Sequence, residues 1–244
     1  MADAPHTARA LARETLTREI LAAGRARLAT DGPVALSLRA VARDVGMVSS
    51  AVYRYFPSRD ALLTALIVEC YDELGAAVED ADAAVADRDD VAARWLAACR
   101  ALRGWAVAHP AELGLLYGTP VPGYAAPRDT VDPATRVVRV LVTVVAGAHA
   151  TGAEPRPAPD GAPDATAVVD PARQFVAARG IVDDAPTELV ARALMAWTTL
   201  FGTVSFEIFG HLVGSVTDPG EWFDAVALRL ADDLGIIRSR RTGG

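Results

Sequence analysis

The chain has no lysine, and it contains few cysteines and histidines. All 24 of its basic residues are arginines; with abundant alanine, valine, aspartate and proline, this indicates a GC-rich coding bias rather than a function. Cys70 and Cys99 are far apart and lie among apolar residues. We expect two buried thiols, neither a disulfide nor a metal site. The four histidines lack metal-ligand spacing, and nucleophile elbow, phosphate-loop and dinucleotide motifs are missing. The sequence therefore predicts no catalytic residues, metal or cofactor.

Long uninterrupted apolar runs are also missing. The first residues, MADAPHTARALARE, contain no hydrophobic region of a signal peptide. Arg139 limits one of the longest apolar stretches, and Arg192 and Glu207 bracket the other, so neither is expected to span a bilayer. We expect a soluble cytoplasmic protein that makes no membrane contact.

The charge of the chain is unevenly distributed. Its 244 residues, 52% of them hydrophobic, carry a net charge of −7, which by itself argues against nucleic-acid binding. Residues 1–60, however, hold nine arginines and six acids, whereas the remaining residues hold fifteen arginines and twenty-five acids. A basic N-terminal part on an acidic remainder is typical of a regulator with one DNA-facing module.

Hydrophobic periodicity is helical nearly everywhere, which predicts an all-α fold. The first helix is expected over about 17–30, where Gly32 and the following proline stop it. A second helix begins after Ser37, a good N-cap, and ends at Gly46, whose conformational freedom suits a tight turn. Further helices are expected near residues 48–56, 58–78, 95–109, 111–117, 134–150, 171–179, 186–212 and 219–234.

The short helix at 48–56 carries small and hydroxyl-bearing side chains where a core helix would carry leucine, isoleucine or valine. They are Ser49, Ser50, Ala51, Tyr53 and Tyr55. A slim, polar outer face suits a helix that enters the major groove of DNA.

The N-terminal pattern resembles the tetracycline-repressor (TetR) family of transcriptional regulators over residues 15–65. The residues that carry this resemblance are Ser37, Ala42, Gly46, the run Val52-Tyr53-Arg54-Tyr55-Phe56, Arg59 and Leu62-Leu63. The resemblance implies phosphate contacts from Ser37, Tyr53, Tyr55 and Arg59. It implies base-edge contacts from Arg39, Ser49, Ser50 and Ala51, with Arg39 the best candidate for guanine. Relatives often carry threonine or serine at the Ala51 position, so a hydrogen bond is lost there.

Three further arginines of the first helix have two interpretations. For Arg13, Arg18 and Arg25 we favour a solvated helix face over DNA contact. An N-terminal arm with Arg9 and Arg13 could still reach a groove or the DNA backbone.

The C-terminal part has a weaker resemblance. The segment AWTTLFG at 196–202 is similar to the motif of the WHG type of TetR C-terminal domain, with Phe201 in the histidine position. In the family the last two helices of each chain typically form the dimer. Here they carry much apolar surface, although an intramolecular core is the alternative. The candidate interface residues are Phe206, Phe209, Leu212, Val213, Trp222, Val226 and Leu230.

A ligand pocket is expected in the same part of the chain. Aromatic residues at helical spacing more often belong to the hydrophobic core. For each candidate, a core position is therefore the alternative to ligand contact. The candidate lining residues are Trp95, Trp105, Tyr117, His149, Trp197 and Phe201. Their apolar character favours a lipophilic or aromatic ligand.

The resemblance implies a three-helix helix-turn-helix head (15–60) on a larger α-helical ligand-binding and dimerisation body (61–238). The remaining parts are a flexible arm (1–14), a mobile loop (152–166) and a tail (239–244). The implied function is a ligand-responsive regulator in the bacterial nucleoid. As a homodimer it binds a pseudo-palindromic double-stranded operator, most simply as a repressor released by a small molecule. The alternatives are a helical protein-interaction scaffold and an enzyme, both without DNA binding.

Overall fold

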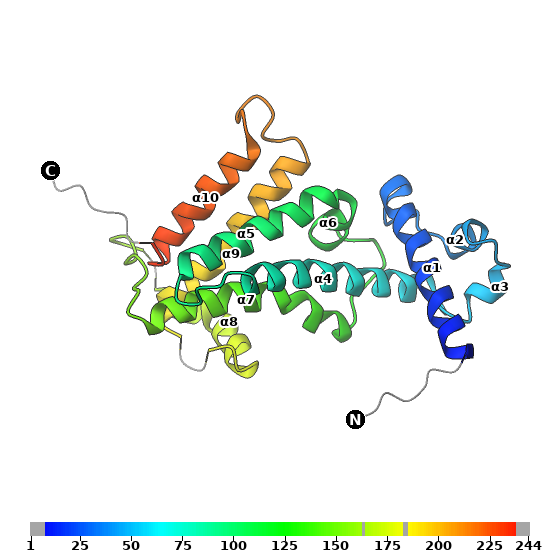
Figure 1. Ribbon diagram of the computed structural model, residues 1–244, viewed down its shortest axis with the longest axis horizontal. Coiled ribbons are helices and arrows are strands. Elements are labelled where there is room, and N and C mark those ends of the chain that lie inside the picture. Colours follow the sequence, from blue (N-terminus) through cyan, green and yellow to red (C-terminus); the bar gives the residue numbers. More distant parts are fainter. Residues whose placement is uncertain (1–7, 163, 183–184, 238–244) are drawn as a thin grey trace. The chain divides into compact units, whose positions relative to one another are not determined.

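The computed structural model describes residues 8–162, 164–182 and 185–237, and these ranges fold into helices joined by irregular segments (Figure 1). They contain ten α-helices, one short 3-10 helix (η1, Arg128–Thr130) and no β-strand. The predicted all-α fold is therefore confirmed. The predicted tail at 239–244 lies outside the described residues.

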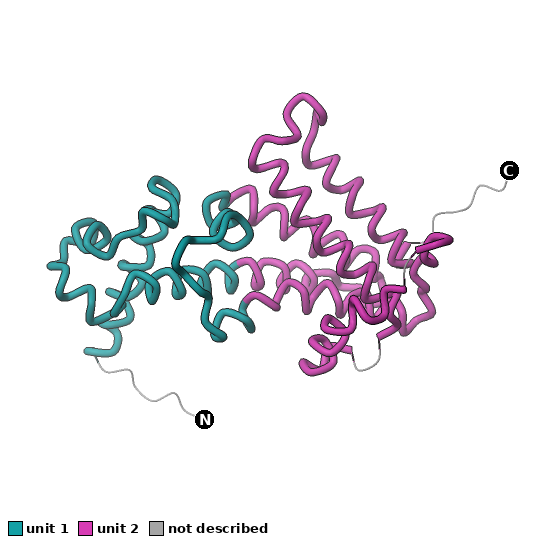
Figure 2. Tube along the Cα trace, turned by 180° about the vertical axis from the view of Figure 1, so that it is seen from behind, with its two compact units in different colours: residues 1–73, 109–133 teal, residues 74–108, 134–244 magenta. Residues whose placement is uncertain are grey.

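The chain divides into two compact units (Figure 2). Unit 1 comprises the residues up to Glu73 together with His109–Pro133, and unit 2 comprises Leu74–Ala108 and the chain from Ala134 onward. The long helix α4 (Arg59–Ala83) contributes to both units. The sequence placed the end of the head at residue 60, whereas unit 1 also takes in the first part of α4, helix α6 (Pro110–Tyr117) and the segment after it.

Unit 1 packs α1 (Ala8–Asp31), α2 (Leu38–Asp44) and α3 (Ser49–Val52) around the start of α4. The turn between α2 and α3 contains Gly46 at φ +65°, a left-handed conformation that favours glycine. Val41, Val52 and Phe56 belong to the buried core of this unit, and Val121 joins them from the segment after α6.

Two helix boundaries of unit 1 differ from the prediction. Helix α1 begins at Ala8 rather than near Thr17, because its first two turns consist of good helix formers that bury no apolar stripe. Helix α3 ends at Val52 rather than near Phe56. Pro57 disfavours a helical conformation at the preceding residue.

Unit 2 is built from α5 (Val91–Ala108), α7 (Val131–Ala150), α8 (Thr166–Ala178), α9 (Thr187–Ile208) and α10 (Pro219–Asp233), with the end of α4. Helix α10 packs on α5 and α9, and α8 packs on α9. Helix α10 begins after a capping residue: the Asp218 carboxylate accepts hydrogen bonds from the amides of Gly220 (2.8 Å) and Glu221 (3.0 Å).

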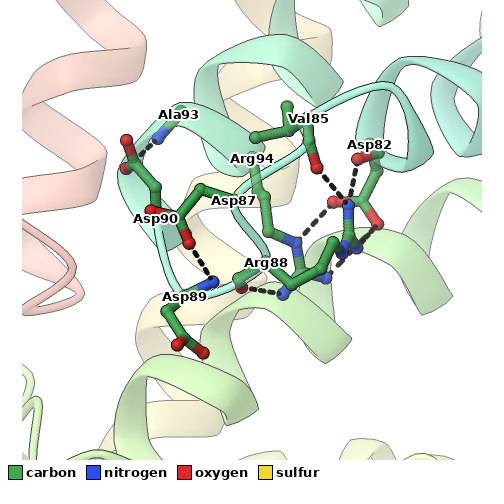
Figure 3. A network of polar contacts seen from close by, with 8 residues as sticks. All are labelled: Asp82, Val85, Asp87, Arg88, Asp89, Asp90, Ala93 and Arg94. Atoms are coloured by element: carbon green, nitrogen blue, oxygen red, sulfur yellow. Dashed lines mark hydrogen bonds and ion pairs between the residues drawn. The ribbon is translucent and has the colours of Figure 1, made fainter.

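The connection from α4 to α5 is held by a polar network (Figure 3). The Asp82 carboxylate, at the end of α4, accepts hydrogen bonds from Arg94 Nε (2.8 Å) and Arg88 Nη2 (2.7 Å). Burial opposes ionisation of Asp82, but the two guanidinium groups outweigh it and lower the pKa of this carboxyl. These ion pairs fasten the end of α4 to α5 within unit 2.

The expected mobile loop is irregular where it is described, and it is joined to the end of α10. The Arg156 amide donates to the Asp233 carbonyl (2.9 Å), and Arg192 Nη2 donates to the Pro157 carbonyl (2.8 Å). Elsewhere, Cys70 and Cys99 are buried free thiols, as predicted, and burial raises the pKa of Cys70 to about 12.

One helix in the described part of the chain, α9, is long and apolar enough to cross a membrane by length and composition alone. Its most apolar window has a mean hydropathy of 1.3. A packed core helix of a soluble protein meets the same criterion, so this is weak evidence for a span.

Candidate functional site

Helices α2 and α3 form a helix-turn-helix whose inner face is apolar and whose outer face is polar. Val52 is fully buried and Phe56 nearly so. Arg39 and Ser50 are exposed, and Tyr53 is 45% exposed. The predicted contact residues Ser49, Ala51 and Tyr55 are half-buried. None of these six expected contact residues is packed into the core.

Ser37 and Arg59, two of the predicted phosphate-binding residues, differ in how far their polar groups are engaged within the protein. Ser37 is the N-cap of α2, but its side chain makes no capping hydrogen bond, so its hydroxyl is not occupied by the helix. Arg59 donates to the carbonyls of Pro33 (2.8 Å), Leu36 (3.2 Å) and Val34 (3.2 Å). Its guanidinium therefore holds the segment before α2 in place, which leaves few of its five N–H groups for a phosphate.

Ion pairs sort the arginines of unit 1 into two groups. Arg27 pairs with Asp44 (2.7 Å) and Asp31 (2.9 Å), and its hydrogen bonds lower the pKa of Asp44. Arg25 binds both carboxylate oxygens of Glu73 and also pairs with Glu112. In the described ranges, no ion pair to a carboxylate is found for a second group, which comprises Arg9, Arg13, Arg18, Arg39, Arg43, Arg54 and Arg128. Their positive charge remains available to a polyanion.

Unit 2 contains a cavity of about 480 Å³ between α7, α8 and α9, with Trp95 of α5 also in its wall. Its volume lies in the usual range of small-molecule sites. Among the lining residues that the structure describes, none is charged, and Thr135 carries the only hydroxyl group. The lining residues are Trp95, Ala134, Thr135, Val138, Leu141, Val142, Val145, Ala146, Pro171, Ala172, Phe175, Val176, Val182, Ala185, Leu189, Val190, Ala193, Leu194 and Trp197.

Of the six aromatic and histidine residues expected in a pocket, the structure brings Trp95 and Trp197 to this cavity. Trp105, His149 and Phe201 lie in unit 2 but not in the cavity wall. Tyr117 belongs to unit 1, where it makes an edge-to-face contact with Tyr71, the ring centroids lying 6.0 Å apart.

Most residues of the cavity wall were not predicted from the sequence. Val138, Leu141, Val142 and Val145 recur at spacings of three and four, which places them on one face of α7. This periodicity can be read from the sequence. It indicates that one face of α7 is buried, but not whether a neighbouring helix fills the space beside that face.

The predicted interface residues of α9, α10 and the segment between them differ in how far they are exposed to solvent. Phe206, Phe209, Val213 and Trp222 are exposed, and Leu212 and Leu230 are half-buried. Val226 is buried inside unit 2, because it lies on the inner face of α10 together with Phe223. Three further exposed apolar residues on the two helices were not predicted: Leu194, Met195 and Leu228.

Metal ligation gains no support from the described side chains. No group of three or more histidine, cysteine, aspartate or glutamate residues among them could hold an ion.

Comparison with known proteins identifies the family. Residues 20–66 match "Bacterial regulatory proteins, tetR family", and residues 95–230 match "Tetracyclin repressor-like, C-terminal domain". The HTH-type transcriptional regulators Rv1816 of Mycobacterium tuberculosis and Mb1846 of Mycobacterium bovis are each 45% identical to this chain over 220 residues, covering 88% of it and 90% of the relative. The chain belongs to the TetR family. The crystal structure of the regulatory protein SCO4313 is similar to it, with a TM-score of 0.74, 33% identity, and coverage of 92% of this chain and 98% of the other.

Membership of the TetR family confirms the resemblance found in the first 65 residues and accounts for the helix-turn-helix. This TetR protein is a DNA-binding transcriptional regulator and not an enzyme. The WHG type of its C-terminal domain stays a prediction.

Proposed function

We propose that this TetR-family regulator is a cytoplasmic, nucleoid-associated repressor. As a homodimer it binds a pseudo-palindromic operator and is released by a small lipophilic or aromatic molecule. The observation that carries the proposal is the pairing of a polar, cation-rich helix-turn-helix in unit 1 with a cavity in unit 2 whose described lining residues are uncharged. DNA binding and effector binding then reside in separate compact units.

In the proposed complex α3 enters the major groove. Arg39, Ser49, Ser50 and Ala51 lie at base edges, and Ser37, Tyr53, Tyr55 and Arg59 lie at phosphates. The exposure of Arg39, Ser50 and Tyr53 supports this arrangement. Arg39 fits a guanine best, because it is exposed and has no ion pair to a described carboxylate.

Replacement of Arg39 by alanine is expected to weaken operator binding by about 1–3 kcal/mol and to relax the sequence preference at one base pair. The operator is first located by footprinting of the intergenic DNA beside the gene. Affinities for it and for single-base variants are then measured by fluorescence anisotropy. Tyr53→Phe is the matched comparison and should weaken all sites about equally. An unchanged base preference in Arg39→Ala would assign the base readout to another residue.

The proposed dimer is supported by the apolar surface of α9 and α10. Phe206, Phe209 and Trp222 are large side chains exposed to more than 40%, which is costly in a protein that remains a monomer. A two-fold axis through this surface gives a self-complementary interface, and it sets the two recognition helices about 34–36 Å apart, one turn of DNA.

The cavity supports an uncharged, hydrocarbon-rich effector. Against the described lining residues, none of which is ionisable, a charged group would lose its hydration without gaining a partner. Binding weakens the DNA complex only if the ligand prefers a conformation of unit 2 that is incompatible with the operator-bound dimer. The chain passes between the units within α4, at Ala108–His109 and at Pro133–Ala134, and these covalent connections can carry the effect.

Filling the cavity is expected to abolish ligand binding. N-phenyl-1-naphthylamine, a neutral lipophilic fluorophore, is titrated into the wild type and into Ala193→Trp, which adds an indole to the cavity wall. We expect the affinity to fall by a factor on the order of ten or more, with a matching loss of ligand-induced thermal stabilisation. Val168→Trp adds the same side chain at a position of α8 that is 78% exposed and should bind normally. Equal binding by both variants would place the probe elsewhere.

A further inference from the structure

Arg13 of α1 makes a specific contact with the helix-turn-helix. Its guanidinium carbon lies 5.2 Å from the centroid of the Tyr55 ring, which is within cation–π range. Tyr55 follows α3, and both residues belong to unit 1. The contact therefore joins the N-terminal part of α1 to the end of the recognition helix.

The position of Arg13 is not explained by packing. Residues 8–15 of α1 are all exposed, and the first buried residue of this helix is Ile20. The contact with Tyr55 is thus a surface contact between an exposed cation and a half-buried ring.

Arg13 also differs from the arginines of α1 that form ion pairs within unit 1. Arg25 and Arg27 are neutralised by carboxylates on neighbouring helices. Arg13, in contrast, has no ion pair to a carboxylate in the described part of the chain. A guanidinium meets an aromatic ring through its face, whereas its N–H groups point outward in the guanidinium plane. The ring contact restrains the side chain and leaves those donors for a phosphate.

We infer that Arg13 is a DNA phosphate-binding residue and that Tyr55 is the positioning residue that holds its guanidinium beside the recognition helix. The contact is independent of base sequence, and each protomer of the dimer supplies one. It extends the DNA-binding surface from α2 and α3 to α1. This inference rests on the proposed binding of duplex DNA by a dimer.

The test measures affinity for a fluorescein-labelled random-sequence duplex of about 30 base pairs as a function of salt, which requires no knowledge of the operator. Arg13→Gln is compared with Arg18→Gln, the same charge change on an exposed face of the same helix. We expect Arg13→Gln to make the slope of log K against log salt shallower by about 2, with affinity at 0.1 M salt falling on the order of 50-fold. Arg18→Gln should change the slope by less than half of that.

The role of Tyr55 is tested in the same assay by combining Arg13→Gln with two substitutions. Tyr55→Phe keeps the ring, so the loss caused by Arg13→Gln should persist at full size. Tyr55→Leu removes the ring, and the same loss should shrink several-fold. Circular dichroism melts confirm that each variant is folded.

The possible outcomes separate the two proposals. Failure of the wild type to bind the duplex in a salt-dependent manner would overturn the proposed binding of duplex DNA by a dimer, on which the role of Arg13 rests. Normal wild-type binding with equal slopes for Arg13→Gln and Arg18→Gln would overturn only the role of Arg13. An undiminished Arg13→Gln effect in the Tyr55→Leu background would overturn the positioning role of Tyr55.

Discussion

Replacement of Arg25 by methionine is expected to lower the free energy of unfolding by about 3–5 kcal/mol, because it leaves a buried carboxylate without a partner. The Arg25 guanidinium joins three helices of unit 1: it extends from α1 to Glu73 of α4, at 2.7 Å for one of its two contacts, and to Glu112 of α6. The Glu112 side chain is only 11% exposed. Methionine keeps most of the side-chain volume, so the loss reports the missing charge. Urea unfolding at neutral pH measures it.

Two further variants separate this effect from the loss of any arginine. Arg27→Met removes an ion-pairing arginine of the same helix whose partners, Asp31 and Asp44, are more exposed, and it should lower the free energy of unfolding far less than Arg25→Met does. Adding Glu112→Gln to Arg25→Met removes the orphaned charge and should restore a large part of the stability. Equal losses in Arg25→Met and Arg27→Met would show that the pair with Glu112 contributes no more than a surface pair.

Replacement of Phe206 by glutamate is expected to convert the proposed dimer into a folded monomer and to weaken operator binding at least about 100-fold. The Phe206 side chain is 55% exposed on α9. A new carboxylate would face its symmetry mate near the two-fold axis and lose its hydration there. A monomer also loses the high effective concentration with which the second recognition helix meets its half-site. Sedimentation velocity gives the oligomeric state, and anisotropy gives the operator affinity.

The matched control for Phe206→Glu is Val168→Glu on α8. It places the same charge on another exposed apolar residue of unit 2, outside the proposed interface. This variant should remain a dimer with normal operator affinity. A wild type that sediments as a monomer would refute the proposed dimer, and a Phe206→Glu variant that remains dimeric would move the interface away from this face of α9.

Local patterns predicted much of the fold, because each depends on residues close together in the sequence. The i, i+4 pair Val52 and Phe56 is buried, and Gly46 has the positive φ expected for its turn. Ser58 caps α4 by accepting from the Ala61 amide at 3.0 Å. The start of α1 was misplaced for the same reason, since its first turns have helix-forming residues but no apolar stripe that would reveal them.

The sites were less predictable, because they depend on which helix faces which. Trp95 and Trp197 line the cavity but Trp105 and Phe201 do not, although all four are aromatic residues at helical spacing. Likewise, Val226 and Trp222 were grouped together in the sequence, yet one is buried and the other exposed.

The sequence by itself determined that this chain is an all-α TetR-family regulator, because caps, turns and short-range apolar spacing specify the helix-turn-helix locally. Only the tertiary structure decided which arginines remain unpaired, where α7, α8 and α9 leave a cavity, and that α6 belongs to the same compact unit as the DNA-binding helices. These features arise from contacts between residues distant in the chain, such as that of Arg25 with Glu112, and no local pattern encodes them.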